Sequence, residues 1–287
     1  MIDLFHRVIE SITLLECLRY AFMKRALLAV MLGTPMFALL GTMVVSNRMV
    51  FFSDVLGHSA LTGVAIGVIM GLMDPLWSTL AFAVVLAISV NVFRRTTHAA
   101  NETVLGVFLA TTVALGIVIL SRGGGFAKFS SYLIGDILAV SPGQLVIMAV
   151  LFVVVLAYWA VAANGLVLVS ISPSLARSRG MSSFLIETSF AVLLAVVVTF
   201  SIRLVGILMI NSLLVLPAAA ARNLATNVRS YTLWTVALSM FSGFAGLFAS
   251  YYWGTASGAT IVLFSAAFYV LAAVCGGWWR GRAFARS

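Results

Sequence analysis

Charged residues are scarce in this 287-residue sequence. Asp, Glu, Lys and Arg together make up 9% of it, whereas soluble domains carry about 25%. Apolar residues account for 63% of the chain, and the mean hydropathy is +1.16. This balance excludes a soluble globular domain and indicates an integral membrane protein that is surrounded by membrane lipid.

Motifs of nucleotide and covalent chemistry are also missing. No G-x-x-x-x-G-K-[ST] sequence occurs, and the chain has no soluble domain that could bind ATP. The metalloprotease motif H-E-x-x-H is absent. Cysteine is limited to Cys17 and Cys275, which have neither metal-binding nor redox spacing. We therefore expect no enzyme activity and no permanently bound cofactor, and an ATP-driven process would need its ATPase on a separate chain.

Acidic residues are outnumbered by basic ones, 8 against 17, and the formal net charge is +9. The basic residues lie between apolar segments, where the positive-inside rule explains them without a nucleic-acid partner. Arginine-rich connections alternate with connections that contain few basic residues. This alternation predicts a cytoplasmic C-terminus.

Long apolar runs are what the sequence has in abundance. We predict a single transmembrane domain over residues 1–287, an all-α polytopic bundle of about eight to nine helices. Residues 1–25 are expected to open it as an amphipathic segment at the lipid interface. The candidate membrane segments are residues 26–47, 54–73, 76–93, 102–121, 142–163, 183–201, 203–221, 231–253 and 258–278.

Some of these runs are interrupted. Pro35 lies inside the first segment and Pro217 inside the seventh, and proline removes a helical hydrogen bond. Residues 131–142 form a short apolar piece bounded by breakers, as in a re-entrant helix. Broken or re-entrant helices at membrane depth need protein or a water-filled pathway around the freed backbone, which is typical of transporters. A packing kink without a role in transport is the alternative at each position.

Residues 164–182 form the least membrane-like interior region. Residues 167–169 read V-L-V, as in a brief strand. Ser172 is a helix N-cap and Gly180 a helix stop, so a short cytoplasmic helix is predicted between them. This helix is either a solvated connection or a docking element that couples the membrane domain to a cytoplasmic partner. Its candidate coupling residues are Pro173, Leu175, Ala176, Arg177, Arg179 and Gly180.

An aspartate and a histidine stand four residues apart at the start of the second segment, as Asp54 and His58. At 3.6 residues per turn, the two side chains lie on one face of a helix. Both are ligands for divalent metal ions, and both are costly near the bilayer core unless they face protein or water. The pair is therefore a candidate metal site. The alternative is an Asp–His hydrogen bond that packs helices or relays protons.

Other residues are candidates for a pathway or a gate. Glu187 lies inside a membrane segment, where an ionisable residue suggests a function; its alternative is pairing with Arg203 or with a polar group of another helix. Asp136 borders an interrupted stretch and could line the exit of a pathway. Asp136 and Glu102 could equally cap helices, because carboxylates favour helix N-termini. Pro217 interrupts an apolar run and is a candidate gating position.

A resemblance to a known family begins at the same pair. Residues 54–65 read D-V-L-G-H-S-A-L-T-G-V-A, which resembles the D-A-x-S-H-A-x-x-P-G-V-A signature of the membrane subunits of zinc, manganese and iron ABC importers. Residue 62 is threonine where the family often has proline, and residue 57 is glycine where it has serine. Neither departure removes a candidate ligand. Similar blocks follow in the family's order at residues 101–106, 132–141, 204–219 and 255–263.

The resemblance implies a permease fold and a role in transport. It implies that two copies of the chain form a homodimer in the bacterial inner membrane and that cytoplasmic ATP-binding subunits drive transport. An extracytoplasmic metal-binding protein would deliver zinc, manganese or iron, and Asp54 and His58 of both copies would face a shared pathway. Two alternatives remain: a proton-coupled secondary metal carrier, and a permease for a metal chelate such as a siderophore or corrinoid. A chelate permease would leave the ligand pair unexplained.

Overall fold

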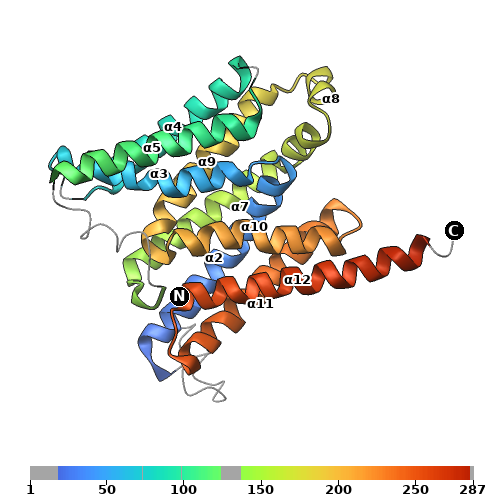
Figure 1. The fold of residues 1–287 in the computed structure, drawn as a ribbon. Helices are drawn as coiled ribbons and strands as arrows, with labels where there is room; N and C mark the ends of the chain where they lie inside the picture. The colour runs from blue at the N-terminus through green and yellow to red at the C-terminus, as the bar shows by residue number, and fades with distance from the viewer. Residues whose placement is uncertain (1–18, 73, 98, 124–136, 285–287) are drawn as a thin grey trace.

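The computed structural model describes residues 19–72, 74–97, 99–123 and 137–284. In this part of the chain the regular structure is entirely helical (Figure 1), which confirms the all-α prediction. The elements, in chain order, are α2 Ala21–Ser46, α3 Val50–Ile69, α4 Leu76–Thr96, α5 Asn101–Gly123, the 3₁₀ turn η2 Ile137–Ala139, α7 Pro142–Ile171, α8 Pro173–Ser178, α9 Ser183–Val205, α10 Ile207–Leu224, α11 Val228–Trp253 and α12 Ser257–Phe284.

The membrane-spanning architecture is confirmed as well. Among the described residues, 8 helices are long and apolar enough to cross a membrane, and these are α2, α3, α4, α5, α7, α9, α11 and α12. The other long helix, α10, corresponds to the predicted segment 203–221 and is displaced toward the C-terminus by several residues. Each predicted segment thus corresponds to one long helix.

The long helices form two groups. Helix α3 packs against α5 and α4, and α4 packs against α9. Helix α2 packs against α11, α10 and α7, while α10 and α11 both pack against α12. Figure 1 shows α3, α4 and α5 in one part of the bundle and α10, α11 and α12 in the other, with α2, α7 and α9 between them. Helices α3 and α10 also contact each other directly, where the two groups meet.

Helices α2 and α10 approach each other backbone to backbone. A Cβ atom added at Gly41 of α2 would lie 2.1 Å from the carbonyl oxygen of Leu214 in α10, far inside the distance of about 3.5–4.0 Å at which heavy atoms normally pack. Small residues at such crossings are characteristic of membrane helix bundles. The absence of a side chain at residue 41 therefore sets the position of α10 relative to α2.

Helix α7 extends further than predicted. The strand expected at residues 167–169 is wrong, because α7 continues without a break to Ile171. In lipid, a helix satisfies its backbone polar groups internally, so an apolar V-L-V run that adjoins a membrane helix prolongs it. Residues 164–171 of the region predicted to couple to a partner therefore belong to α7.

The short helix predicted after α7 is α8. The Ser172 hydroxyl accepts a hydrogen bond from the backbone N–H of Leu175 at 3.3 Å, which caps the helix start. The chain leaves α8 through Gly180, whose φ of +74° favours glycine. Ala176 is fully buried, whereas Leu175 exposes 48% of its surface. Helix α8 is thus anchored on one side, against α7 and α9, and open on the other.

Neither of the two prolines that interrupt an apolar run in the sequence breaks its helix in the structure. Helix α2 continues through Pro35, and α10 continues through Pro217. A single residue, Gly206, separates α9 from α10, with φ +79° and ψ 160°, a backbone conformation essentially restricted to glycine. Asp136 and most of the predicted N-terminal segment lie outside the described residues.

Candidate metal-binding site

Asp54 and His58 lie together near the start of α3. The Nε2 atom of His58 is 3.5 Å from Oδ1 of Asp54, and the two side chains expose 50% and 41% of their surfaces, respectively. Their spacing of one turn follows from the helix that residues 50–69 form. The partly exposed carboxylate and the exposed imidazole on one helix face are both ligand types for a divalent metal ion.

A third residue, from α10, joins this pair. The side-chain amide of Asn211 donates a hydrogen bond to Oδ1 of Asp54 at 2.8 Å, across 157 residues of sequence. The Oδ1 atom of Asn211 is itself buried and has no hydrogen-bond partner among the described residues. Sequence reasoning missed Asn211. The available signal was an amide side chain between Ile210 and Ser212 in an otherwise apolar run.

Asp54 and Asn211 line a small cavity between α3 and α10. Its volume is about 240 Å³, and its walls are completed by Val50, Phe51, Ser53 and Val215. A water molecule takes up about 30 Å³ in the liquid, so the cavity can admit an ion together with part of its hydration shell. The Ser53 hydroxyl is bonded to the Val50 carbonyl oxygen of its own helix. The hydroxyl oxygen keeps its acceptor lone pairs, so the polar side chains that line the cavity are those of Ser53, Asp54 and Asn211.

A single copy of the chain supplies few ligands. No group of three or more His, Cys, Asp and Glu side chains that could hold a metal ion occurs within the part of the chain that the structure describes. Protein zinc sites usually have three or four protein ligands. The Asp54–His58 pair alone would bind an ion weakly unless water or a second chain completes the coordination.

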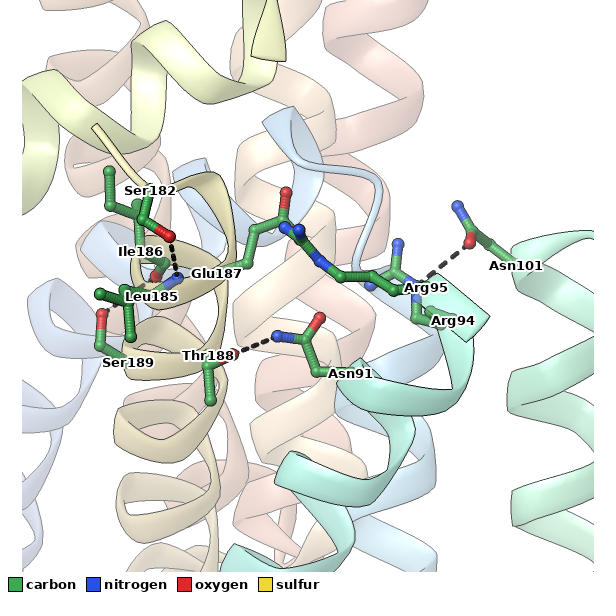
Figure 2. A network of polar contacts seen from close by, with 10 residues as sticks. All are labelled: Asn91, Arg94, Arg95, Asn101, Ser182, Leu185, Ile186, Glu187, Thr188 and Ser189. Carbon is green, nitrogen blue, oxygen red and sulfur yellow. Dashed lines mark hydrogen bonds and ion pairs between the residues drawn. The ribbon is translucent and has the colours of Figure 1, made fainter. Parts of the chain in front are cut away.

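Glu187 belongs to a different polar cluster, between α9 and α4 (Figure 2). Its Oε2 atom lies 3.5 Å from Nη2 of Arg95, and the Arg95 guanidinium lies 4.9 Å from the centroid of the Phe184 ring. Glu187 is therefore paired with a charged group of another helix, which is the alternative to a role in the pathway. Pro217 lies buried within α10.

Further polar contacts extend this cluster. The Asn91 amide of α4 donates to the Thr188 hydroxyl of α9, and Nε of Arg94 donates to Oδ1 of Asn101 at 3.2 Å (Figure 2). Glu102 lies in the first turn of α5, as expected for an acid at a helix N-terminus. These contacts tie the end of α4 to the starts of α9 and α5.

The Arg95–Glu187 pair is expected to contribute little to stability. Its side chains are 42% and 27% exposed, and exposed ion pairs contribute about 1 kcal/mol or less. We expect a double-mutant cycle with Arg95→Met and Glu187→Gln to give a coupling free energy below about 1 kcal/mol, measured by reversible unfolding of the detergent-solubilised protein. A coupling above about 2 kcal/mol would contradict this expectation and identify a buried, structural pair.

Comparisons with known proteins cover almost the whole chain. The profile described as "ABC 3 transport family" matches residues 19–276, a span that contains Asp54, His58 and Asn211. The chain is 32% identical over 233 residues to the high-affinity zinc uptake system membrane protein ZnuB of Haemophilus influenzae, with 81% of this chain and 89% of that protein covered. It is 24% identical over 255 residues to the manganese transport system membrane protein MntC of Listeria monocytogenes, with 89% and 91% covered.

The fold has a close counterpart among solved structures. A chain in the structure of PsaBC from Streptococcus pneumoniae in complex with Fab superimposes with a TM-score of 0.76 at 25% sequence identity. The superposition covers 95% of this chain and 95% of the other. The helical arrangement described above is therefore shared along nearly the full length of both chains.

Proposed function

This chain belongs to the ABC 3 transport family, and from that premise we propose that it forms the membrane pathway of an ATP-driven importer for zinc, manganese or iron. It is a multi-pass protein of the bacterial inner membrane. The observation that carries the proposal is the exposed Asp54–His58 pair beside a cavity in a membrane-embedded bundle. Placing these groups there is costly, and cation transport gives a reason for it. The chain itself performs no covalent chemistry.

Asp54 and His58 serve as a way-station for the ion. A carboxylate oxygen and a neutral imidazole nitrogen suit Zn²⁺, Mn²⁺ and Fe²⁺ alike. Conduction requires a site that the ion can leave, and a two-ligand contribution from each chain meets that requirement. We propose that a second copy of the chain supplies a second Asp54–His58 pair across a shared pathway, so that four protein ligands surround the ion during passage.

Helix α8 is the proposed contact for the cytoplasmic ATP-binding subunit. Ala176 holds the helix against the bundle, while Leu175 and the neighbouring Arg177 and Arg179 are exposed. Arginine is enriched in protein interfaces, so an exposed leucine beside two exposed arginines is a reasonable contact surface for a partner. An extracytoplasmic metal-binding protein delivers the ion on the opposite side of the membrane.

Leu175→Asp is expected to weaken docking of the ATP-binding subunit and thereby to reduce ATP-driven uptake. An unpaired charge buried in a protein interface costs about 2 kcal/mol or more, which corresponds to a decrease in ATPase-subunit affinity of roughly 30-fold. We expect ATP-driven uptake to fall by a similar factor at limiting ATPase, while metal binding by the membrane chain stays unchanged. Pull-down of the ATPase and cobalt titration of the same preparation check both parts. Normal ATPase binding would contradict the assignment of α8.

The proposed function is tested by uptake in proteoliposomes that contain this chain with its ATP-binding subunit and binding protein. Zinc, manganese and iron are each supplied, with ATP or a non-hydrolysable analogue inside. We expect uptake that needs ATP hydrolysis and persists when a protonophore dissipates the proton gradient. Uptake that stops with the protonophore at constant ATP would instead indicate a proton-coupled carrier. Transport of an intact siderophore or corrinoid, with no free-ion uptake, would indicate a chelate permease.

A further inference from the structure

Asn211 contacts the proposed ion ligand more closely than His58 does. Its amide nitrogen is 2.8 Å from Oδ1 of Asp54, whereas the His58 nitrogen is 3.5 Å from the same atom. Among the described residues these are the contacts that the Asp54 carboxylate makes, and both involve Oδ1. The second carboxylate oxygen, Oδ2, is therefore the one without a described protein partner beside the cavity.

The Asn211 amide is suited to bind one oxygen of the Asp54 carboxylate and leave the other free. An ionised carboxylate has two oxygens and about four acceptor positions. A donor fixed on Oδ1 restricts rotation of the carboxylate about its bond to Cβ and leaves Oδ2 to accept a cation. Groups that orient a metal ligand in this way commonly change metal affinity about 10–100-fold when they are removed.

Packing alone does not account for an asparagine at position 211. Its Oδ1 atom is buried without a partner among the described residues, and an unsatisfied buried acceptor costs about 1–3 kcal/mol. A leucine has the same branched shape as asparagine and would leave no acceptor unsatisfied. The penalty is offset if the amide nitrogen performs a task at Asp54 that an apolar side chain cannot perform.

We propose that Asn211 is a positioning residue of the ion pathway, which holds the Asp54 carboxylate through Oδ1 so that Oδ2 and His58 face the passing ion. The proposal rests on the proposed function, since it assigns Asn211 to the Asp54–His58 site. It also links the two groups of helices, because Asn211 belongs to α10 and Asp54 to α3. Binding of the ion on α3 then depends on where α10 lies.

The test is a Co²⁺ titration of the full-length chain, assembled with its ATP-binding subunit in lipid nanodiscs. Co²⁺ reports affinity through binding and coordination through its visible d–d absorption. We expect Asn211→Leu to raise the Co²⁺ dissociation constant about 10–100-fold. At saturating Co²⁺ its spectrum should match the wild type, because no ligand is lost. A changed spectrum at saturation would overturn the positioning role and identify Asn211 as a direct ligand.

Two comparisons keep the result specific. Ser212→Ala is the matched control, since the Ser212 hydroxyl is bonded to the Met209 carbonyl oxygen of its own helix, and it should leave the Co²⁺ affinity within about twofold of wild type. In an Asp54→Ala background, Asn211→Leu should cause little further loss, because an effect that acts through Asp54 disappears with Asp54. An equal loss in both backgrounds would overturn the proposal.

Failure of the proposal and failure of the proposed function give different results. If Asp54→Ala weakens Co²⁺ binding but Asn211→Leu does not, only the role of Asn211 is wrong. If Asp54→Ala and His58→Ala both bind Co²⁺ like the wild type, the way-station itself is wrong, and the assignment of Asn211 fails with it.

Discussion

Asp54→Ala is expected to reduce ATP-driven metal uptake at least about 100-fold, because loss of a ligand costs no less than loss of a group that orients one. His58→Ala should have an effect of the same order. The Asp54 side chain lines the cavity and lies within reach of His58 and Asn211, so its removal would take both the negative charge and the proposed oxygen ligand from the site. Uptake of the preferred ion by proteoliposomes measures the loss.

Controls separate a lost ligand from a damaged protein. ATP hydrolysis by the assembled complex should persist in both variants, since neither residue lies on α8. Asp74→Ala makes the same chemical change in the connection between α3 and α4, where the Asp74 carboxylate accepts a hydrogen bond from the Leu76 N–H, and should transport normally. Wild-type uptake by Asp54→Ala and His58→Ala would show that the pair is structural.

Gly41→Ala is expected to destabilise the protein by about 2–3 kcal/mol. The added methyl group would meet the backbone carbonyl of Leu214 at 2.1 Å, and overpacking of a tight contact typically costs about 1–3 kcal/mol. The upper part of that range applies because a backbone carbonyl, unlike a side chain, cannot rotate away. Reversible unfolding of the solubilised protein in a denaturing detergent measures the change.

Gly106→Ala is the matched control for this substitution. Gly106 is also a helical glycine, and a Cβ atom there would meet nothing within 4 Å. Since alanine is favoured over glycine in helices, Gly106→Ala should be neutral or stabilising by up to about 1 kcal/mol. Equal destabilisation by both substitutions would mean that the close crossing of α2 and α10 does not limit stability.

The helices were predictable because lipid leaves the backbone few choices. Segments of sufficient length and apolarity must form helices, and the predicted segment 183–201 begins at the residue where α9 begins. The same rule explains the error at residues 167–169, where β-branched residues suggested a strand although the adjoining helix could simply continue. The pairing of Asp54 with His58 was predictable because it depends only on helical periodicity.

Contacts between helices were much harder to predict from the sequence. The Asn211–Asp54 hydrogen bond joins residues 157 positions apart, and it depends on how α10 is rotated and how deep it lies against α3. The partner of Glu187 could not be predicted for the same reason, since Arg95 of α4 lies 92 positions earlier in the chain. Local spacing contains no information about such crossings, because the packing of small residues such as Gly41 determines them.

The crossing at Gly41 also bears on how such sequences diverge. Leu214, whose carbonyl meets Gly41, is on the same helix as Asn211 and less than one turn from it. We expect a larger residue at position 41 to move α10, and with it the Asn211 amide, away from Asp54, so residues 41, 54 and 211 should vary together although they belong to three different helices. Lineages that enlarge residue 41 are expected to have accepted a compensating change on α10.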